Sequence, residues 1–114
     1  MTVVQGPCSP KPCVLFIEGA LRWPVSRELR DRVRTLLRRG ERSILLDLDR
    51  LSQIDAAGIG ELVRAYNMAT AVNGSLRIAH ATTWVREVLQ RVGLLDLLSA
   101  EWESDEERRA GLRG

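Results

Sequence analysis

The spacing of apolar and polar residues alternates between a strand period and a helix period along the chain. A short strand, a Gly/Pro turn and a second strand from Cys13 to Glu18 come first, and prolines keep the turn irregular. The compact apolar run Ser43–Asp49 is typical of a buried central strand, and Ser75–Ala79 alternates as a half-buried strand does. This pattern predicts four strands, to which the stretch "AEWES" adds a weak edge strand.

Three longer segments carry apolar residues at helical spacing. They predict helices over about Arg27–Arg39, about Gly58–Val72, and from Thr82 or Thr83 to Gly93. Ser26 is expected to cap the first of them. The second is expected to bury four side chains, those of Ile59, Leu62, Val63 and Tyr66.

The last part of the chain completes the expected fold. "LLDLL", at 94–98, is expected to close the core, and Ser104 with Glu107 forms a capping box that predicts a short terminal helix. Strands that alternate with helices of this length imply helices packed on a mostly parallel sheet. We therefore expect one α/β domain over residues 1–114, in which three to four helices pack on a mixed, mostly parallel sheet of four to five strands.

The composition is that of an ordinary globular domain, with 45% apolar and 28% charged residues in a chain of 114. No apolar run approaches the roughly 18 residues of a membrane span, and the start of the chain lacks the pattern of a signal peptide. A cytoplasmic protein without a transmembrane segment is therefore expected. The net charge of +2 argues neither for nor against an acidic partner.

A basic stripe runs along the first predicted helix and consists of Arg27, Arg30, Arg34 and Arg38. Acidic residues interleave with it, and no aromatic stacking platform accompanies it. The stripe is therefore interpreted as a solvated helix face, and no nucleic-acid partner is expected.

The acidic and glycine motifs fall short of an enzymatic site. Asp47 and Asp49 form a D-x-D at a strand end, as in aspartyl phosphotransferases, but those sites usually need a later lysine and Lys11 is the only one. The two aspartates are expected to close the strand and face solvent. "GIGELV" lacks the third glycine of a dinucleotide site, and His80, expected in an exposed loop, has no nucleophile beside it. The chain is predicted not to be an enzyme and to need no cofactor.

Two cysteines, Cys8 and Cys13, lie in the stretch "CSPKPC". A disulfide between them is geometrically conceivable, but a reducing cytosol disfavours it. A zinc site would need two further ligands, and His80 is the only histidine. Two free thiols and no metal site are expected.

The turn "IDAAGIG" is the most informative segment. Asp55 is placed to cap the second helix by accepting hydrogen bonds from the amides of Ala57 and Gly58. Gly58 and Gly60 have no side chains, so another surface could approach the first turn closely. Free amides and the positive end of the helix dipole would make this turn a docking surface. A phosphate group added there would change the charge of that surface.

An ordered set of motifs resembles the STAS domain family of bacterial anti-sigma factor antagonists. The matching elements are Asp47-Leu48, Ile54-Asp55, Gly58-Ile59-Gly60, Asn73-Gly74 and Val85…Leu89…Gly93-Leu94…Leu97. The resemblance covers roughly residues 13–99, which leaves a short C-terminal strand and helix at 100–114 outside it. It implies a STAS-like fold and a role in partner switching and transcription regulation in bacterial signalling.

The family pattern is D-S-S-G, and its second serine is phosphorylated by an anti-sigma kinase, which then releases the domain. Here the two serines are Ala56 and Ala57. Because alanine has no oxygen to accept a phosphoryl group, no phosphorylation is expected at the family position, Ala57.

Three functions stay open. The first is a non-enzymatic antagonist or stressosome-type scaffold that is locked in the binding state and binds an anti-sigma factor or serine kinase. The second resembles the small STAS subunit of ABC-type lipid transporters, which binds the ABC ATPase and also carries a D-x-A-G turn. The third is a diverged interaction domain with an unrelated protein partner. The oligomeric state, including a homodimer, stays open as well.

The partner is expected to contact the Asp55 turn and one tryptophan. The candidate residues are Asp55, Ala56, Ala57, Gly58, Ile59, Gly60, Glu61 and Trp23. Trp23 precedes the first helix, where an exposed tryptophan would be a hot spot, although packing over the core edge is an equal alternative. Trp84 is interpreted as a packing residue at the start of the third helix.

Overall fold

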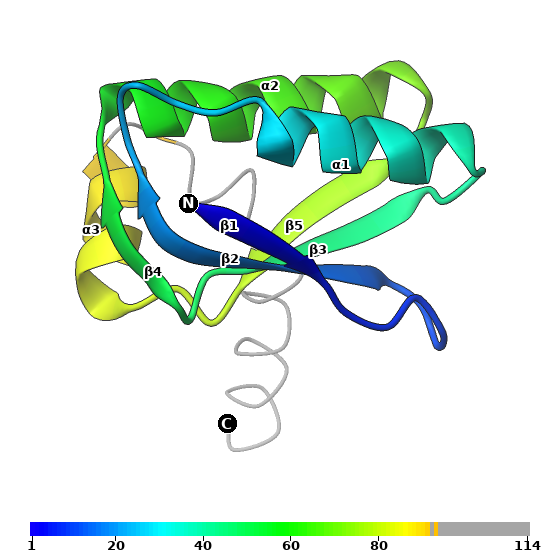
Figure 1. Cartoon of the computed structure of the whole chain (residues 1–114), viewed down its shortest axis with the longest axis horizontal. Coiled ribbons are helices and arrows are strands. Elements are labelled where there is room, and N and C mark those ends of the chain that lie inside the picture. The colour runs from blue at the N-terminus through cyan, green and yellow to red at the C-terminus, as the bar shows by residue number, and fades with distance from the viewer. Residues whose placement is uncertain (92, 94–114) are drawn as a thin grey trace, which may run out of the picture.

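The computed structural model describes residues 1–91 and 93. Five strands form the sheet: β1 (Thr2–Gln5), β2 (Cys13–Leu21), β3 (Ser43–Asp47), β4 (Leu51–Ile54) and β5 (Ser75–Ala79). The helices of the described part are α1 (Glu28–Arg38), α2 (Ala56–Ala71) and α3 (Thr83–Arg91). Figure 1 shows α1 and α2 side by side over one face of the sheet, with α3 at the end where β4 lies. None of these described helices combines the length and apolarity that a membrane crossing requires.

The sheet is mixed and mostly parallel, which confirms the expected fold class. Its order is β1-β2-β3-β5, with β1 antiparallel to β2 and the other pairs parallel. The long strand β2 changes partner along its length. Its first half pairs with β3, and its last three residues, Gly19–Leu21, pair with β4, with a shift in register between Gly19 and Ala20. The fifth strand is therefore β4, whereas the predicted strand in "AEWES" lies outside the described residues.

The segment Ser43–Asp49 is shorter as a strand than predicted, because the chain turns at its end. The Asp47 carboxylate accepts a hydrogen bond from the Asp49 amide at 3.0 Å, and β4 begins two residues later. The other carboxylate oxygen lies 2.9 Å from Nδ1 of His80, so Asp47 is only 12% exposed. The expectation that Asp47 faces solvent is therefore wrong, while His80 is exposed as expected.

The core lies between the sheet and the two long helices. Its largest members alternate along β2, β3 and β5: Leu15, Ile17, Ile44, Leu46, Leu76 and Ile78. In α2 the buried residues are Gly58, Glu61, Leu62, Ala65 and Ala69. Of the four residues expected to be buried, only Leu62 is, whereas Ile59, Val63 and Tyr66 are partly buried, so the buried face is rotated. Three of the five buried residues are glycine or alanine, whose small size lets the helix backbone come close to the sheet.

The start of α1 is held in two ways. Ser26 Oγ accepts a hydrogen bond from the Glu28 amide at 3.1 Å, although Arg27 occupies the capping position. The Glu28 carboxylate in turn accepts from the Val3 amide at 2.7 Å and ties α1 to β1. The predicted strand in "LLDLL", the capping box at Ser104 and the terminal helix lie outside the described residues.

The β1–β2 hairpin ends in a disulfide between Cys8 and Cys13. The expectation of two free thiols is therefore wrong. The hairpin pairs continue to the cysteines: the Gly6 amide donates to the Val14 carbonyl at 2.8 Å, and the Val14 amide donates to the Pro7 carbonyl at 3.0 Å. The backbone thus brings two residues five positions apart face to face.

Candidate functional site

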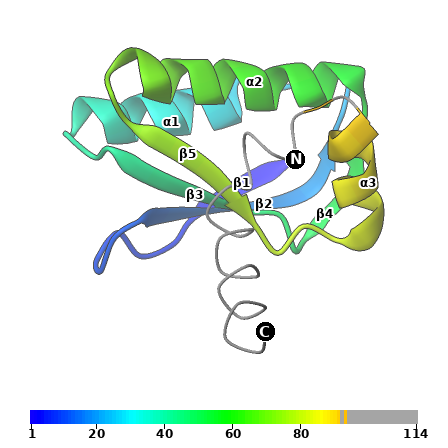
Figure 2. The same cartoon turned by 180° about the vertical axis from the view of Figure 1, so that it is seen from behind.

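Two loops emerge side by side at one edge of the sheet, because β2 and β4 are parallel and end together. Leu21 is paired with Ile54 at the end of the ladder, and the Asp55 amide donates to the Leu21 carbonyl at 3.3 Å. The β2–α1 loop and the β4–α2 turn therefore share the carboxyl end of the sheet, where ligands of α/β sheets usually bind. Figures 1 and 2 show β4 leading into the first turn of α2 on the side where α3 lies.

Asp55 connects these two loops through its carboxylate. Oδ1 accepts a hydrogen bond from the Gly58 amide at 2.9 Å and so caps α2, as predicted. Oδ2 accepts from the Trp23 amide at 3.0 Å. The bonds from Trp23 and Gly58 hold the pKa of Asp55 below its ordinary value, and the Ala57 amide and the charge of Arg22 act in the same direction. The carboxylate therefore stabilises the site as a charged group.

The tip of α2 is not the bare positive end that the sequence suggested. The Asp55 carboxylate binds the Gly58 amide, and the Asp55 carbonyl accepts from the Ile59 amide at 2.9 Å. A carboxylate at a helix N-terminus also offsets the positive end of the dipole. Two amides at the start of α2, those of Gly58 and Ile59, are thus bound by Asp55 rather than displayed, and Ala56 and Ala57 add small apolar side chains beside them.

The two alanines of the turn are accessible. Ala56 is exposed and Ala57 is partly exposed, so neither is sealed in the core. Gly58, by contrast, is buried against β2, and a Cβ atom built on it would lie 1.9 Å from the Leu21 carbonyl oxygen. Its expected role in admitting another protein is therefore corrected: it admits the chain's own strand. Within the described part of the chain, a Cβ on Gly60 would approach only a guanidinium nitrogen of Arg64, at 3.9 Å.

Glu61 faces inward and is fully buried, at 0% exposure. Its carboxylate binds Arg30 Nε of α1 at 3.0 Å and a guanidinium nitrogen of Arg64 at 3.0 Å. The expectation that Glu61 contacts a partner is therefore wrong for its side chain, which instead joins α2 to α1. Arg30 belongs to the stripe interpreted as solvated, and its pairing 31 residues away was not predicted. The only signal was an acid beside Leu62 on the inner side of the helix.

Two tryptophans border the site. Trp23 is 74% exposed, so it stands out from the surface rather than folding over the core edge. Trp84 is 40% exposed, which makes it more open than a packing residue. A surface hollow of about 360 Å³ separates α3 from the end of β4, and it is lined by Arg22, Gln53, Ile54, Asp55 and Trp84. This hollow combines apolar surface with one cation, Arg22, and one anion, Asp55.

Comparison with known proteins relates most of the chain to a protein family and to solved structures. The family model described as "Mlab, STAS domain" matches residues 7–99. None of the curated proteins matches the chain in sequence.

Solved structures give the same result for the fold. The Bacillus cell fate determinant SpoIIAA in its phosphorylated form is similar with a TM-score of 0.64 at 22% identity, over 82% of this chain and 85% of that one. The anti-sigma factor antagonist SpoIIAA in its unphosphorylated form gives 0.63 at 21% identity, over 78% and 82%. A sulfate transporter family protein from Wolinella succinogenes gives 0.62 at 20% identity, over 77% and 71%.

Proposed function

Since the chain belongs to the STAS domain family, whose members are typically non-catalytic modules, we propose that it is a non-enzymatic module that binds a kinase-like or regulatory partner. The docking surface is the outer face of the α2 tip, which we define as Asp55, Ala56, Ala57 and Gly60, together with Trp23. Ile59 supports this face from its partly buried position.

Gly60 is the observation that carries the proposal. A glycine inside a helix costs about 0.5–1 kcal/mol relative to alanine. Gly58 must be glycine because the Leu21 carbonyl leaves no room for a Cβ, whereas beside Gly60 the described residues leave room for one. Packing within the described part of the chain therefore does not require glycine at position 60. Close approach of another protein to the helix backbone would require it.

Trp23 supplies the affinity at this surface. Tryptophan is the residue type most often found among binding hot spots. Its backbone amide is fixed on Asp55 at 3.0 Å, which anchors the residue beside the tip, and its side chain is 74% exposed. A partner that covers this ring would bury a large apolar surface.

Ala57 removes the phosphorylation switch. SpoIIAA is known in phosphorylated and unphosphorylated forms. In the D-S-S-G pattern that the turn resembles, the phosphorylated serine corresponds to Ala57. A phosphoserine would bring about −1.5 to −2 charges to the interface. With a methyl group in its place the surface stays apolar, so the module stays competent to bind in the presence of kinase and ATP. We assign it to a cytoplasmic sigma-factor or stressosome-type pathway that regulates transcription.

An alternative is the small STAS subunit of an ABC-type lipid transporter, which binds its ATPase. The D-x-A-G turn from Asp55 to Gly58 favours it. The likeness to a sulfate transporter family protein shows that the same fold occurs in a transport protein.

Affinity purification from cells that express the chain separates the two functions. Recovery of a histidine-kinase-like ATPase supports the first, and an ABC ATPase with a permease supports the alternative. The same bait carrying Ala57→Glu should lose its partner, because a charge then lies on the docking face. Ala71→Glu is the matched control, since it adds the same charge at the exposed far end of α2. Full recovery with Ala57→Glu would place the partner on another surface.

A further inference from the structure

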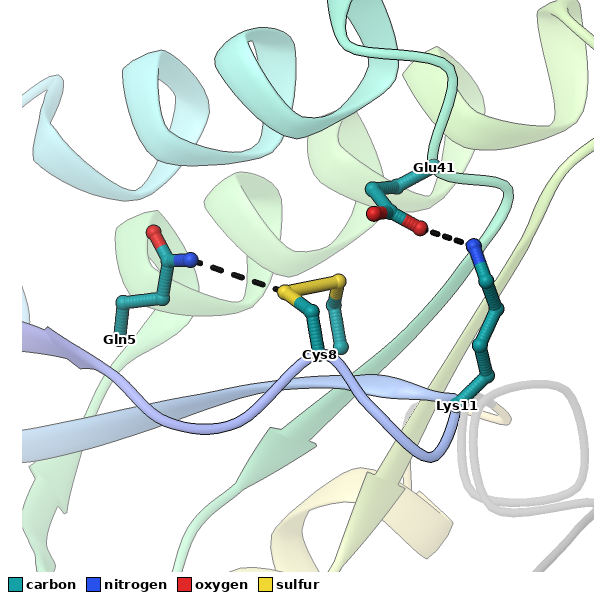
Figure 3. The surroundings of a disulfide bond; sticks show 5 residues. Gln5, Cys8, Lys11 and Glu41 are labelled. Carbon is teal, nitrogen blue, oxygen red and sulfur yellow. Dashed lines mark hydrogen bonds and ion pairs between the residues drawn. A yellow bond between two sulfur atoms is a disulfide. The ribbon is translucent and has the colours of Figure 1, made fainter.

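The tip of the β1–β2 hairpin gathers three metal-ligating groups that the proposed partner surface does not use. They are the sulfurs of Cys8 and Cys13 and the carboxylate of Glu41, which comes from the α1–β3 connection. One ligand atom from each lies within 4.8 Å of the other two. Figure 3 shows the Glu41 side chain extending toward the disulfide from the loop above it.

Backbone contacts hold these groups in place independently of the sulfur–sulfur bond. The hairpin pairs Gly6 with Val14 and Val14 with Pro7, which fixes the residues next to both cysteines. On the other side, the Glu41 amide donates to the Leu36 carbonyl at 3.0 Å. Breaking the disulfide would therefore leave two thiols and a carboxylate facing one another.

Polar contacts position two of these ligands. Gln5 Nε2 lies 3.6 Å from Cys8 Sγ and donates a hydrogen bond to it. Lys11 forms an ion pair with Glu41, which keeps the carboxylate at the tip. Cys13 is fully buried and Glu41 is 23% exposed, so the group is closed on one side and reachable from the other.

We propose that the reduced hairpin tip binds Zn²⁺ through Cys8, Cys13 and Glu41. Two thiolates and a carboxylate suit zinc, whereas Mg²⁺ and Ca²⁺ prefer oxygen ligands alone. Three protein ligands leave a fourth position for water. Sequence spacing did not predict this site, because Glu41 is 28 residues from Cys13 and only the fold brings it to the sulfurs.

The disulfide is the metal-free, oxidised form of the same site. A dithiol reductant gives two electrons to the Cys8–Cys13 bond and becomes a disulfide itself, which leaves two protein thiols. Binding of Zn²⁺ then releases the two thiol protons, and Glu41 exchanges Lys11 for the metal. Oxidation reverses this, because sulfurs bonded to each other are no longer thiolate ligands.

Cobalt titration of the whole chain tests the site, with Co²⁺ as a coloured substitute for Zn²⁺. The chain is reduced with a phosphine, desalted without oxygen and titrated. We expect a thiolate-to-cobalt charge-transfer band that saturates at one metal per chain and is bleached by Zn²⁺. The oxidised chain should give no band. Absence of the band in the reduced chain, an equal band in the oxidised chain, or one metal shared by two chains would overturn the proposal.

Glu41→Gln tests the third ligand while both sulfurs remain. Zn²⁺ affinity should fall by about 10–100-fold or more, since even the outer partners of metal ligands contribute that much. Asp31→Asn makes the same chemical change at an exposed α1 residue and should leave the affinity unchanged. Circular dichroism confirms that each variant is folded. Equal affinities of Glu41→Gln and the wild type would remove Glu41 from the site.

Discussion

The first two turns of α2 have an inner and an outer face that are built from one short segment but follow different constraints. On the inner face, Gly58 touches the Leu21 carbonyl and Glu61 joins two arginines, so packing dictates both residue types. On the outer face, Ala57 is partly exposed, and among the described residues a Cβ on Gly60 would approach only Arg64, at 3.9 Å. Residues that the fold does not explain are the ones to examine for function.

Replacing each glycine by alanine gives the sharpest contrast between the faces. Gly58→Ala should destabilise the fold by about 3 kcal/mol, because its Cβ would overlap the Leu21 carbonyl oxygen and force the helix away from β2. Gly60→Ala should raise stability by about 0.5–1 kcal/mol, because the helix gains a better residue in open space. Urea unfolding measures both.

The two variants should also separate stability from binding. We expect Gly60→Ala to weaken partner binding while it stabilises the fold, because its methyl group keeps the partner from the helix backbone. If Gly60→Ala binds the partner as tightly as the wild type, the outer face is not approached closely, and the glycine at position 60 loses its functional explanation.

The ion pairs of Glu61 give the next largest effect. Arg30→Met should cost about 1–3 kcal/mol, because it leaves a fully buried carboxylate with only Arg64, whose side chain is 58% exposed. Glu61→Met should cost less, because the two arginines can turn to water and the methionine fills the space. Thermal unfolding measures the stability of both variants. A larger loss of stability for Glu61→Met than for Arg30→Met would contradict this order.

Because the Asp55 carboxylate lies between the two faces and is stabilised in its charged form, we expect the stability of the fold to depend on pH. Its pKa in the folded state is below the ordinary value of 3.8, so its stabilisation is complete above that value and is lost as the pH falls from 3.8 through the folded pKa. Wild type should therefore exceed Asp55→Asn in stability at neutral pH, and the difference should shrink below 3.8. Unfolding curves at a series of pH values measure it. A difference that stays constant down to acid pH would mean that the charge of Asp55 has no part in the cap.

Local patterns were enough to predict the fold class and the Asp55 cap. Both depend on neighbours in the sequence. The helices and strands follow from the local period of apolar residues, and the capping bond joins Asp55 to Gly58, three residues further on. The accessible positions of Ala56 and Ala57 followed from the same turn. These features could be predicted because few distant residues affect them.

Three features that the sequence did not predict depend on distant residues. β4 is only four residues long and is formed by pairing with the end of β2. The burial of Glu61 depends on Arg30 of α1, and the close packing of Gly58 depends on Leu21 of β2. Such contacts are fixed by tertiary packing, which a single sequence does not display. The disulfide is a different case: its cysteines are five positions apart, and the expected reducing compartment, not the geometry, argued against it.

We propose that the outer face of the α2 tip docks a kinase-like partner and that phosphorylation cannot switch this docking off. Calorimetric titration of the captured partner, before and after incubation with Mg²⁺ and ATP, tests it on the wild type and on Ala57→Ser. We predict that the wild type binds equally well in both conditions, whereas Ala57→Ser takes up phosphate and is released. Loss of wild-type binding after ATP, with phosphate found on a residue such as Ser52, would contradict the account.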